Sequence, residues 1–515
     1  MRFIKSKESE LHPNYVSRVI RIKDEDFSPH PHPDVTKLKC CRIGGDTIYN
    51  VIVSIDSKPG KYVFFPASTK INPEFLRYAN LYRKGEMNSN PNKTGFFEEN
   101  GRVKTIKLKA TYEKVDPSTG IKESVFLPNG VSDGFLIELQ TVLDFILDNF
   151  NIEVKEDDIP DDTWFDTIEH DGKSFWLSKK FIPKVFTKRS QTGGDQSRYK
   201  RRQRKLKRFN RVIPEQFRFH YDTTLVKKVP FVVQPNDYIH ISSKWHGTSL
   251  CAGYVLCKRP LTIKQKIAKF LTGYNFNEYD YLYSSRTVIK NQYIMKESEK
   301  NGNVYHKGFY GCDIWGEAFN VLKSHMIKGM MIYAEIVGYL PNNTYIQKNY
   351  DYGCVPVMDG EEYTYGKHFK IMIYRITLTN VDGDVHEFSP REVQVWCKQH
   401  ELTPVIEYYY GKAKDLYPEL DITNHWHENF WNKMSTDKNF NMEMLSPECN
   451  NKVPHEGVVI KIDDMIPRAF KLKCFAFVNG IEAKELDAGI TNIEDEQSLE
   501  SEEENNSDDF VDGEH

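Results

Sequence analysis

The fold of this chain is decided by one stretch, Asp237-Tyr238-Ile239-His240-Ile241-Ser242-Ser243-Lys244-Trp245-His246-Gly247-Thr248-Ser249. Apolar and polar residues alternate up to Ser243, which is typical of a short strand, and Lys244 then enters a turn closed by Gly247. A lysine in such a turn could attack phosphorus if its amine were neutral. The glycine would let the backbone approach a nucleotide closely. Because Lys-x-His-Gly also fits an exposed turn, the segments further along the chain must decide between the two interpretations.

Four segments downstream carry a charged or aromatic side chain on a predicted strand or at its end. They are Arg286 after Tyr283-Ser284-Ser285, Glu335 within residues 331–338, Tyr374 within residues 370–376, and Glu456 before residues 457–461. A buried strand carries an unpaired carboxylate only at a cost, so Glu335 is expected to pair with a hydroxyl or a cation. Tyr374 offers an aromatic face that could stack on a base.

The last informative segment is Ala469-Phe470-Lys471-Leu472-Lys473-Cys474. The period of two in a strand puts Lys471 and Lys473 on one face and Phe470, Leu472 and Cys474 on the other. Two ammonium groups on one face would hold a phosphate and would lower the pKa of a third lysine nearby. Each charge alone also fits a solvent-facing residue, but the ordered set favours a phosphate-handling site.

In this order the segments resemble the motifs of the covalent nucleotidyltransferase superfamily, and within it those of the ATP-dependent RNA ligases. The turn Lys244 to Gly247 is similar to motif I, and the later segments are similar to motifs Ia (Ser285-Arg286), III (Ala334-Glu335), IIIa (Ile373-Tyr374-Arg375), IV (residues 456–461) and V (residues 471–473). The resemblance is specific over residues 229–477, roughly half of the chain. It extends more weakly upstream to residues 129–132 and 218–223, in a branch that carries an N-terminal OB-like domain.

Two residues depart from the superfamily pattern. His246 stands where many members have Asp, although His is common among RNA ligases, and this leaves open how the water shell of a metal is held near Lys244. Ala334 replaces the usual glycine before the motif III glutamate. Only 42 residues follow Lys473, and 14 of them are acidic, so we expect no counterpart there of the large C-terminal domain of DNA ligases and capping enzymes.

The resemblance implies three phosphoryl transfers through a lysyl-AMP and an adenylated RNA 5′ end. Lys244 would be the nucleophile, and Lys471 and Lys473 would act on the α-phosphate. The ATP-binding residues would be Arg286, Glu335 and Tyr374, together with His246 and Ser249 in and after motif I. Glu456 would hold the hydration shell of Mg²⁺ or Mn²⁺ through water, since magnesium prefers water and phosphate oxygens.

The predicted fold class is α+β, with a β-rich OB-like module followed by an ATP-grasp-like nucleotidyltransferase domain of antiparallel sheets with flanking helices. We predict an OB-like nucleic-acid-binding module at 1–183, a basic connector at 184–228, the adenylation domain at 229–484 and an acidic disordered tail at 485–515. In the first module, residues 37–43 and 47–55 flank Gly44-Gly45-Asp46 as a hairpin, and so do residues 103–115 and 121–127 around 116–120. Spacings of three and four from Phe135 to Phe150 predict a helix, as does the pattern at 391–400.

The formal net charge of −3 conceals a strong charge asymmetry. Residues 184–211 hold twelve Lys and Arg against one Asp, and residues 485–515 hold thirteen Asp and Glu with no Lys or Arg. Clustered cations suit a nucleic-acid backbone, but they also fit a solvated arm or a nuclear-import signal. If the run grips RNA, neutralising Arg201, Arg202, Arg204 and Lys205 weakens sealing and spares adenylation. The tail has too little apolar surface to order by itself.

The sequence lacks the features of secreted, membrane-spanning and zinc-binding proteins. The start of the chain shows no apolar signal segment, no window approaches the ~20 apolar residues of a membrane span, and the nine cysteines show no CxxC spacing. His30, His32, His425 and His427 lack partners at ligand spacing and are interpreted as surface or core residues. These absences predict a cytoplasmic or nuclear protein with no membrane partner. The resemblance implies a monomeric RNA ligase in RNA repair, acting on RNA such as a nicked duplex or an RNA/DNA hybrid. The alternatives are a nucleic-acid-binding scaffold with a degenerate ligase domain, a DNA ligase and a guanylyltransferase.

Overall fold

The structure is a computed structural model of the chain, and it describes residues 1–6, 13–44, 47–115, 122–182, 208–221, 223–295, 303–304, 310–464 and 468–487. Most of the predicted basic connector and of the acidic tail lies outside the described residues, as do the turns at 45–46 and 116–121. Residues 485–487, which the sequence assigns to the tail, form the end of helix α11 (Ala483–Asp487).

The chain divides into two compact units that both draw on distant parts of the sequence. Unit 1 contains Met1–Ile182, Thr224–Asn236 and Ala413–Asp437, and unit 2 contains Pro183–Thr223, Asp237–Lys412 and Lys438–His515. The short segments 224–236 and 413–437 therefore belong with the N-terminal residues by their contacts. The predicted OB-type barrel and the four domain boundaries stay predictions.

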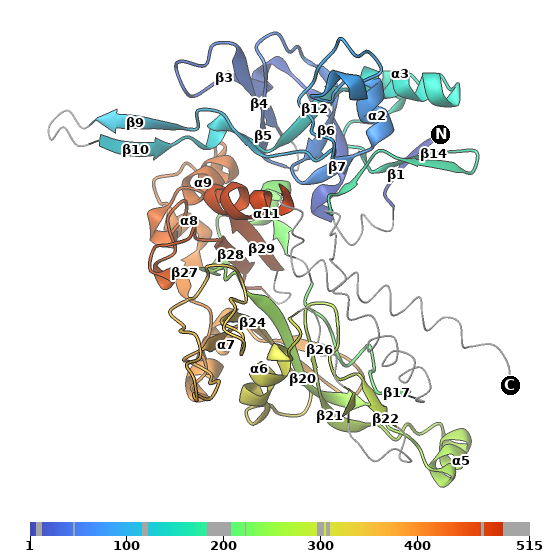
Figure 1. Ribbon diagram of the computed structural model, residues 1–515, viewed down its shortest axis with the longest axis vertical. Coiled ribbons are helices and arrows are strands. Elements are labelled where there is room, and N and C mark those ends of the chain that lie inside the picture. The colour runs from blue at the N-terminus through green and yellow to red at the C-terminus, as the bar shows by residue number, and fades with distance from the viewer. Residues whose placement is uncertain are drawn as a thin grey trace. The chain divides into compact units, whose positions relative to one another are not determined.

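Unit 1 is built from short strands and a few helices (Figure 1). Its elements are β1 (Arg2–Ile4), β2 (Ser17–Ile22), β3 (Phe27–Pro29), β4 (Leu38–Ile43), β5 (Tyr49–Ser54), β6 (Gly60–Pro66), β7 (Thr69–Ile71), α2 (Pro73–Tyr78), β8 (Ile106–Lys107), β9 (Thr111–Val115), β10 (Lys122–Phe126), β11 (Val131–Ser132), β12 (Gly134–Glu138), α3 (Leu139–Phe150), β13 (Trp164–Phe165), β14 (Thr167–His170), β15 (Lys173–Trp176), β16 (Ser178–Lys180), β18 (Thr224–Leu225), α8 (Ala413–Leu416) and α9 (Trp426–Met434).

The core of unit 1 lies between an antiparallel sheet, ordered β12-β6-β2-β13, and helix α3. Both predicted hairpins are confirmed, because β4 pairs with β5 and β9 pairs with β10. The predicted helix is confirmed from Leu139 onward, but its first turn is wrong. Phe135 lies in β12 opposite Phe65 of β6, since strand pairing there satisfies the backbone that a helix would otherwise have to bond internally.

Unit 2 contains longer strands. Its elements are β17 (Arg208–Asn210), β19 (Tyr238–Ser243), β20 (Thr248–Cys257), α5 (Ile263–Thr272), β21 (Glu278–Ser284), β22 (Tyr293–Met295), β23 (Asn303–Val304), α6 (Ile314–Lys323), β24 (Met330–Gly338), β25 (Phe369–Thr379), β26 (Val385–Glu387), α7 (Pro390–Gln399), β27 (Glu407–Lys412), β28 (Gly457–Ile462), β29 (Arg468–Lys473), α10 (Phe475–Phe477) and α11.

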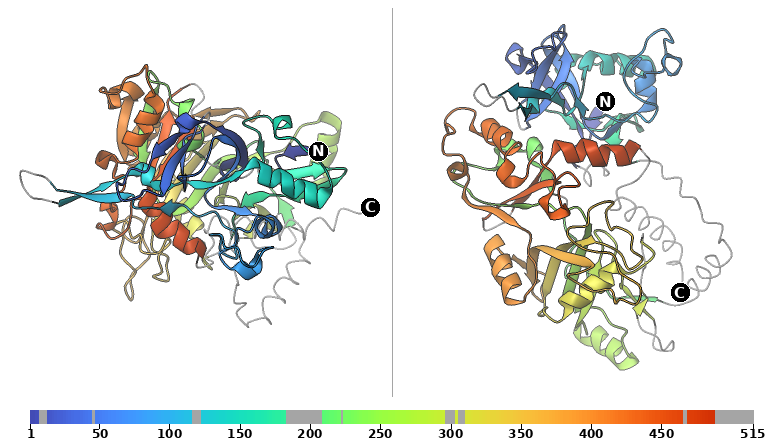
Figure 2. Two further views of the ribbon diagram at one scale, coloured as in Figure 1. Left: turned by 90° about the horizontal axis from the view of Figure 1, so that it is seen from above. Right: turned by 60° about the vertical axis from the view of Figure 1, so that its left-hand side comes forward.

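Two antiparallel sheets organise unit 2. One has the order β21-β20-β24-β25-β26, and in the other β29, β28, β19 and β27 are neighbours. Helices α6 and α7 lie on the first sheet, as Figures 1 and 2 show. The fully buried Trp315 of α6 belongs to the apolar core that the two helices share with this sheet. The predicted mixture of antiparallel sheets and helices is therefore confirmed. Capping boxes begin α5 at Thr262 and α7 at Ser389, and α7 confirms the helix expected at 391–400.

The strands predicted around the candidate site are also confirmed. Lys244 directly follows β19, Arg286 comes two residues after β21, Glu335 lies inside β24, and Glu456 directly precedes β28. No helix in the described part of the chain combines the length and apolar composition needed to cross a bilayer.

Candidate active site

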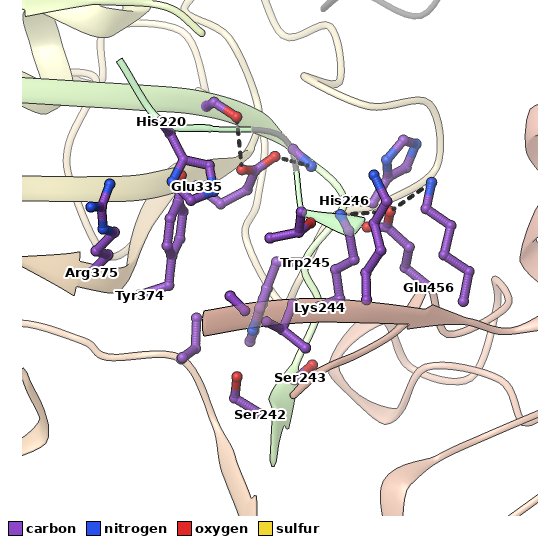
Figure 3. Close-up of a pocket in the computed structure, with 18 of the residues that line it drawn as sticks. His220, Ser242, Ser243, Lys244, Trp245, His246, Glu335, Tyr374, Arg375 and Glu456 are labelled. Atoms are coloured by element: carbon purple, nitrogen blue, oxygen red, sulfur yellow. Dashed lines mark hydrogen bonds and ion pairs between the residues drawn. The ribbon is translucent and has the colours of Figure 1, made fainter. Parts of the chain in front are cut away.

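A pocket in unit 2 is lined by side chains from the two sheets that contain β24 and β28 and from the turn between β19 and β20 (Figure 3). All nine residues proposed from the sequence line it, namely Lys244, His246, Ser249, Arg286, Glu335, Tyr374, Glu456, Lys471 and Lys473. Figure 3 shows His220, Tyr374 and Arg375 at one end of the pocket and Lys244, His246 and Glu456 at the other. The pocket therefore has an aromatic end and a charged end.

Lys244 is held at the charged end by its backbone and by its amine. Its backbone N–H donates to the carbonyl of Gly457 at 2.9 Å, which ties the turn to the start of β28. Its Nζ lies 2.8 Å from Oε1 of Glu456, and Nζ of Lys473 lies 3.6 Å from the same oxygen. Burial alone would raise the pKa of Glu456, but the ammonium groups of Lys244 and Lys473 hold it at about 2. Glu456 is therefore an ionised carboxylate between two cations.

Gly247 is required by the packing of the turn against β24. A Cβ at this position would lie 2.2 Å from the carbonyl oxygen of Ile336 and 3.0 Å from Cγ of Glu335. The backbone N–H of Gly247 donates to Oε1 of Glu335 at 3.0 Å, and the carbonyl of Gly247 accepts from Nε2 of Gln347 at 2.7 Å. The close approach that the sequence attributed to a nucleotide is thus made by the neighbouring strand.

Glu335 reaches the pocket from the middle of β24, and the hydroxyl of Ser249 donates to its Oε2 at 3.4 Å. Burial raises the pKa of Glu335 to about 7, and the nearby Lys244 ammonium opposes that rise. The prediction that this carboxylate pairs with a hydroxyl is met by Ser249. The turn orients one of its oxygens through Gly247 and strand β20 orients the other through Ser249, which fixes the direction in which the carboxylate faces the pocket.

His246 packs between aromatic rings. Its ring meets those of Tyr350 and Phe477 edge to face, each at 4.9 Å between centroids, and its backbone N–H donates to the hydroxyl of Tyr352 at 2.8 Å. Burial lowers the pKa of His246 to about 4, so the imidazole is neutral at physiological pH. His246 therefore carries no charge at this position of the turn.

Tyr374 lies on β25 with its ring half-buried, and the ring of His220 meets it edge to face at 5.0 Å. Its carbonyl accepts a hydrogen bond from Nζ of Lys461 at 2.6 Å. Arg286 lines the pocket from the turn after β21, in which the N–H of Ser285 donates to the carbonyl of Val288 at 3.0 Å. These residues present an aromatic surface with a guanidinium group in the same pocket.

Strand β29 confirms the predicted alternation. Lys471 and Lys473 are half-buried and line the pocket, while Phe470 and Leu472 are buried. In the ladder with β28, Lys471 lies opposite Val459 and Lys473 lies opposite Gly457. Lys473 also forms an ion pair with Glu482.

The structure adds pocket residues that sequence reasoning missed. Lys461 is only 7% exposed, and burial lowers its pKa to about 8. Arg375 forms an ion pair with Glu387 at 2.7 Å, and its guanidinium lies over the ring of Tyr333 at 4.5 Å. A charged residue inside an apolar strand was a visible signal for Lys461 and Arg375, whereas Glu482 follows β29 in a helical segment without such a signal.

The donor atoms of the pocket determine how it could hold a metal ion. Within the described ranges, no group of three or more His, Cys, Asp or Glu side chains is arranged to hold a metal ion directly. Glu456 nevertheless has a buried oxygen, Oε2, without a hydrogen-bond partner. One buried and ionised carboxylate fits a hydrated divalent ion held through water, because magnesium keeps much of its water shell.

Comparison with known proteins finds no match to a family model or to a curated protein sequence. Among solved structures, the chain is similar to a Naegleria gruberi RNA ligase with pyrophosphate, at 12% identity and a TM-score of 0.47, over 91% of this chain and 98% of that one. A variant of that enzyme with AMP and manganese is similar at 11% identity and a TM-score of 0.45, over 90% and 98%. Another variant with ATP and manganese is similar at 12% identity and a TM-score of 0.44, over 90% of this chain and 98% of that one. These scores are low, so the proposed activity rests on the pocket.

Proposed function

We propose that the chain is an ATP-dependent RNA ligase that joins 3′-hydroxyl and 5′-phosphate ends through a lysyl-AMP intermediate. One observation carries the proposal. Nine residues, proposed from the sequence and from its resemblance to RNA ligase motifs, line a single pocket in which the Lys244 amine lies 2.8 Å from Glu456. Separate strands of two sheets supply them, so their meeting does not follow from proximity in the sequence.

In the first step, Nζ of Lys244 attacks the α-phosphorus of ATP. A nitrogen–phosphorus bond forms and the bond from the α-phosphorus to the bridging oxygen breaks. Pyrophosphate leaves with the electron pair of that bond, and the proton that the amine loses passes to solvent water. Charge on the equatorial oxygens must be balanced in this step, so cations and positioning dominate catalysis. Lys473 contacts the α-phosphate and Lys471 lies beside it on the same face of β29.

The nucleoside occupies the aromatic end of the pocket. Tyr374 stacks on adenine, Glu335 accepts a hydrogen bond from a ribose hydroxyl, and Arg286 contacts the ribose or a phosphate. Ser249 acts through Glu335, since its hydroxyl donates to that carboxylate at 3.4 Å. His246 supports the turn as a neutral group packed against Tyr350.

Glu456 holds hydrated Mg²⁺ or Mn²⁺ through water, consistent with its buried and unpaired Oε2. When bound, such an ion neutralises part of the charge on the phosphates. The carboxylate also orients the two lysines that approach it, Lys244 and Lys473.

In the later steps AMP passes from Lys244 to an RNA 5′-phosphate, and an RNA 3′-hydroxyl then displaces AMP to form the phosphodiester. We assign this activity to a monomer that repairs RNA in the cytoplasm, on a nicked duplex or an RNA/DNA hybrid. The domains proposed are those predicted from the sequence, with the OB-like module and the basic connector gripping nucleic acid beside the break.

Sealing assays test the proposal. Labelled RNA with a 5′-phosphate is offered as a nicked duplex, an RNA/DNA hybrid and a single strand, with ATP or GTP and magnesium. The proposal expects ATP-dependent sealing of RNA ends by the full chain and none by Lys244→Ala. Parallel assays separate the alternatives. Covalent transfer of label from α-labelled GTP to the chain would indicate a guanylyltransferase, and preferential sealing of a nicked DNA duplex would indicate a DNA ligase. RNA binding with neither sealing nor transfer of label from nucleotide would indicate a nucleic-acid scaffold.

A further inference from the structure

Glu482 enters the charged end of the pocket from the segment after β29. It lies in the π-helical turn η10 (Val478–Glu482), between α10 and α11, and lines the pocket. Its carboxylate forms an ion pair with Nζ of Lys473, and the side chains of Lys473 and Glu482 are 17% and 26% exposed. The contact is therefore shielded only in part from water.

Lys473 is held between two carboxylates. Its Nζ lies 3.6 Å from Oε1 of Glu456 on one side and contacts Glu482 on the other. Lys244 approaches the same Oε1 of Glu456 at 2.8 Å. Lys244, Glu456, Lys473 and Glu482 thus form a row of alternating charges in which carboxylates balance the ammonium groups proposed to receive phosphate.

The backbone conformation at Glu482 supports a functional role for this residue in the pocket. π-Helical turns are rare, and they are frequent at functional sites. Here the wide turn ends at Glu482 and gives way directly to the α-helical residues Ala483–Asp487. The turn begins after Phe477, whose ring packs on His246 of the pocket at 4.9 Å.

We propose that the Glu482 carboxylate occupies the place of a nucleotide phosphate beside Lys473 and is displaced when ATP binds. A phosphate oxygen and a carboxylate oxygen compete for the same ammonium group, and the two negative charges repel each other when both lie beside it. Glu482 is then a positioning residue that keeps Lys473 directed into the pocket and sets the affinity for ATP. This inference rests on the proposed adenylation activity.

The substitution Glu482→Gln tests it, because the amide keeps an acceptor for Lys473 and removes the charge. For lysyl-adenylate formation by the full chain, we expect the KM for ATP to fall about fivefold, while kcat changes less than about twofold. Glu482→Asp keeps the charge and is expected to restore a KM near that of the unsubstituted chain. Since the effect is electrostatic, the difference in the KM for ATP between Glu482→Gln and the unsubstituted chain should shrink at about 0.5 M salt.

Glu485→Gln is the matched control. Glu485 lies three residues further on and is half-buried, but it is not among the described residues that line the pocket. Its substitution should leave the KM unchanged, and all variants should melt within about 2 °C of the unsubstituted chain.

An unchanged or higher KM in Glu482→Gln would overturn the inference, and so would the same fall in Glu485→Gln or in Glu482→Asp. A fall in kcat alone would also overturn it, since Glu482 would then be needed for the chemistry. If the unsubstituted chain forms no adenylate, the proposed function itself has failed, which is distinguishable from any of these results.

Discussion

Gly247 illustrates how tightly the nucleophile turn is packed at the scale of single residues. Because an added Cβ would lie 2.2 Å from the carbonyl of Ile336, Gly247→Ala must displace the turn or β24. We expect a loss of about 1–3 kcal/mol in the free energy of unfolding, measured with urea, together with loss of adenylate formation. Gly60→Ala is the control, since the nearest atom to its Cβ would be a ring carbon of Tyr62 at 3.8 Å. Equal stability of the two variants would contradict this packing.

Glu335 predicts a pH dependence of stability. Its ordinary pKa of 4.5 is raised by burial to about 7, so between these values the folded chain keeps a proton that the unfolded chain releases. This group therefore stabilises the fold fully below about pH 4.5, and the contribution is lost as the pH rises through 7.

Glu335→Gln removes that titration. The melting temperature of the variant relative to the unsubstituted chain should rise by about 2 °C or more between about pH 5 and pH 7.5 and then level off. A difference that is constant over this range would mean that Glu335 is already ionised at the lower pH.

Single residues could be predicted where a charge interrupts an apolar strand. Glu335 and the lysines of β29 stood out for this reason, and the structure places them at one pocket. The partners that hold them could not be predicted, because the contacts of Glu335 with Gly247 and of Lys473 with Glu456 depend on how distant strands pair. Glu482 was missed because an acidic residue in a helical segment has many ordinary explanations.

At the scale of elements, the two faces of β29 have different roles. Side chains on one face pack in the core and stabilise the fold, and the lysines on the other face line the pocket. Leu472 is 4% exposed, so Leu472→Ala should lower the free energy of unfolding by about 2–5 kcal/mol. Lys471→Ala should keep the melting temperature within about 2 °C and slow adenylate formation about a hundredfold. Thermal melts and rates of label transfer measure both. Reversed effects would show that the lysines face away from the reaction.

Elements were predictable where period and turn chemistry agreed. The hairpin of β4 and β5 has alternating strands around glycine, and both strands form where expected. The error at Phe135 arose because spacings of three and four also fit a strand that runs into a helix. There, β12 pairs with β6 before α3 begins at Leu139.

At the scale of the whole molecule, the composition of the units could not be predicted from the order of the sequence. Residues 413–437 sit far along the chain, yet Glu428 of α9 forms an ion pair with Arg42 at 3.0 Å within unit 1. Lys227 similarly pairs with Asp133 at 2.9 Å. Such contacts join segments that share no local pattern.

Because unit 1 is made of segments that lie far apart in the sequence, cutting the chain between them should destabilise it. A fragment of residues 229–484 would keep α9 but lose residues 1–182, to which unit 1 joins it. We expect the fragment to melt at a lower temperature than the full chain and to bind a hydrophobic dye, because α9 loses its contacts with residues 1–182, among them the ion pair of Glu428 with Arg42. Addition of residues 1–182 should reverse both changes. A fragment that melts cooperatively at the temperature of the full chain would show that unit 2 contains all it needs.

The proposed ligase depends above all on Lys244 carrying AMP, and mapping the adduct tests this directly. The full chain is incubated with α-labelled ATP and magnesium, denatured, digested and analysed by mass spectrometry. We predict AMP on the peptide that contains Lys244, no covalent label in Lys244→Ala, and unchanged label in Lys264→Ala, an exposed lysine on α5. Absence of label from the unsubstituted chain, or label that persists in Lys244→Ala, would contradict this role of Lys244.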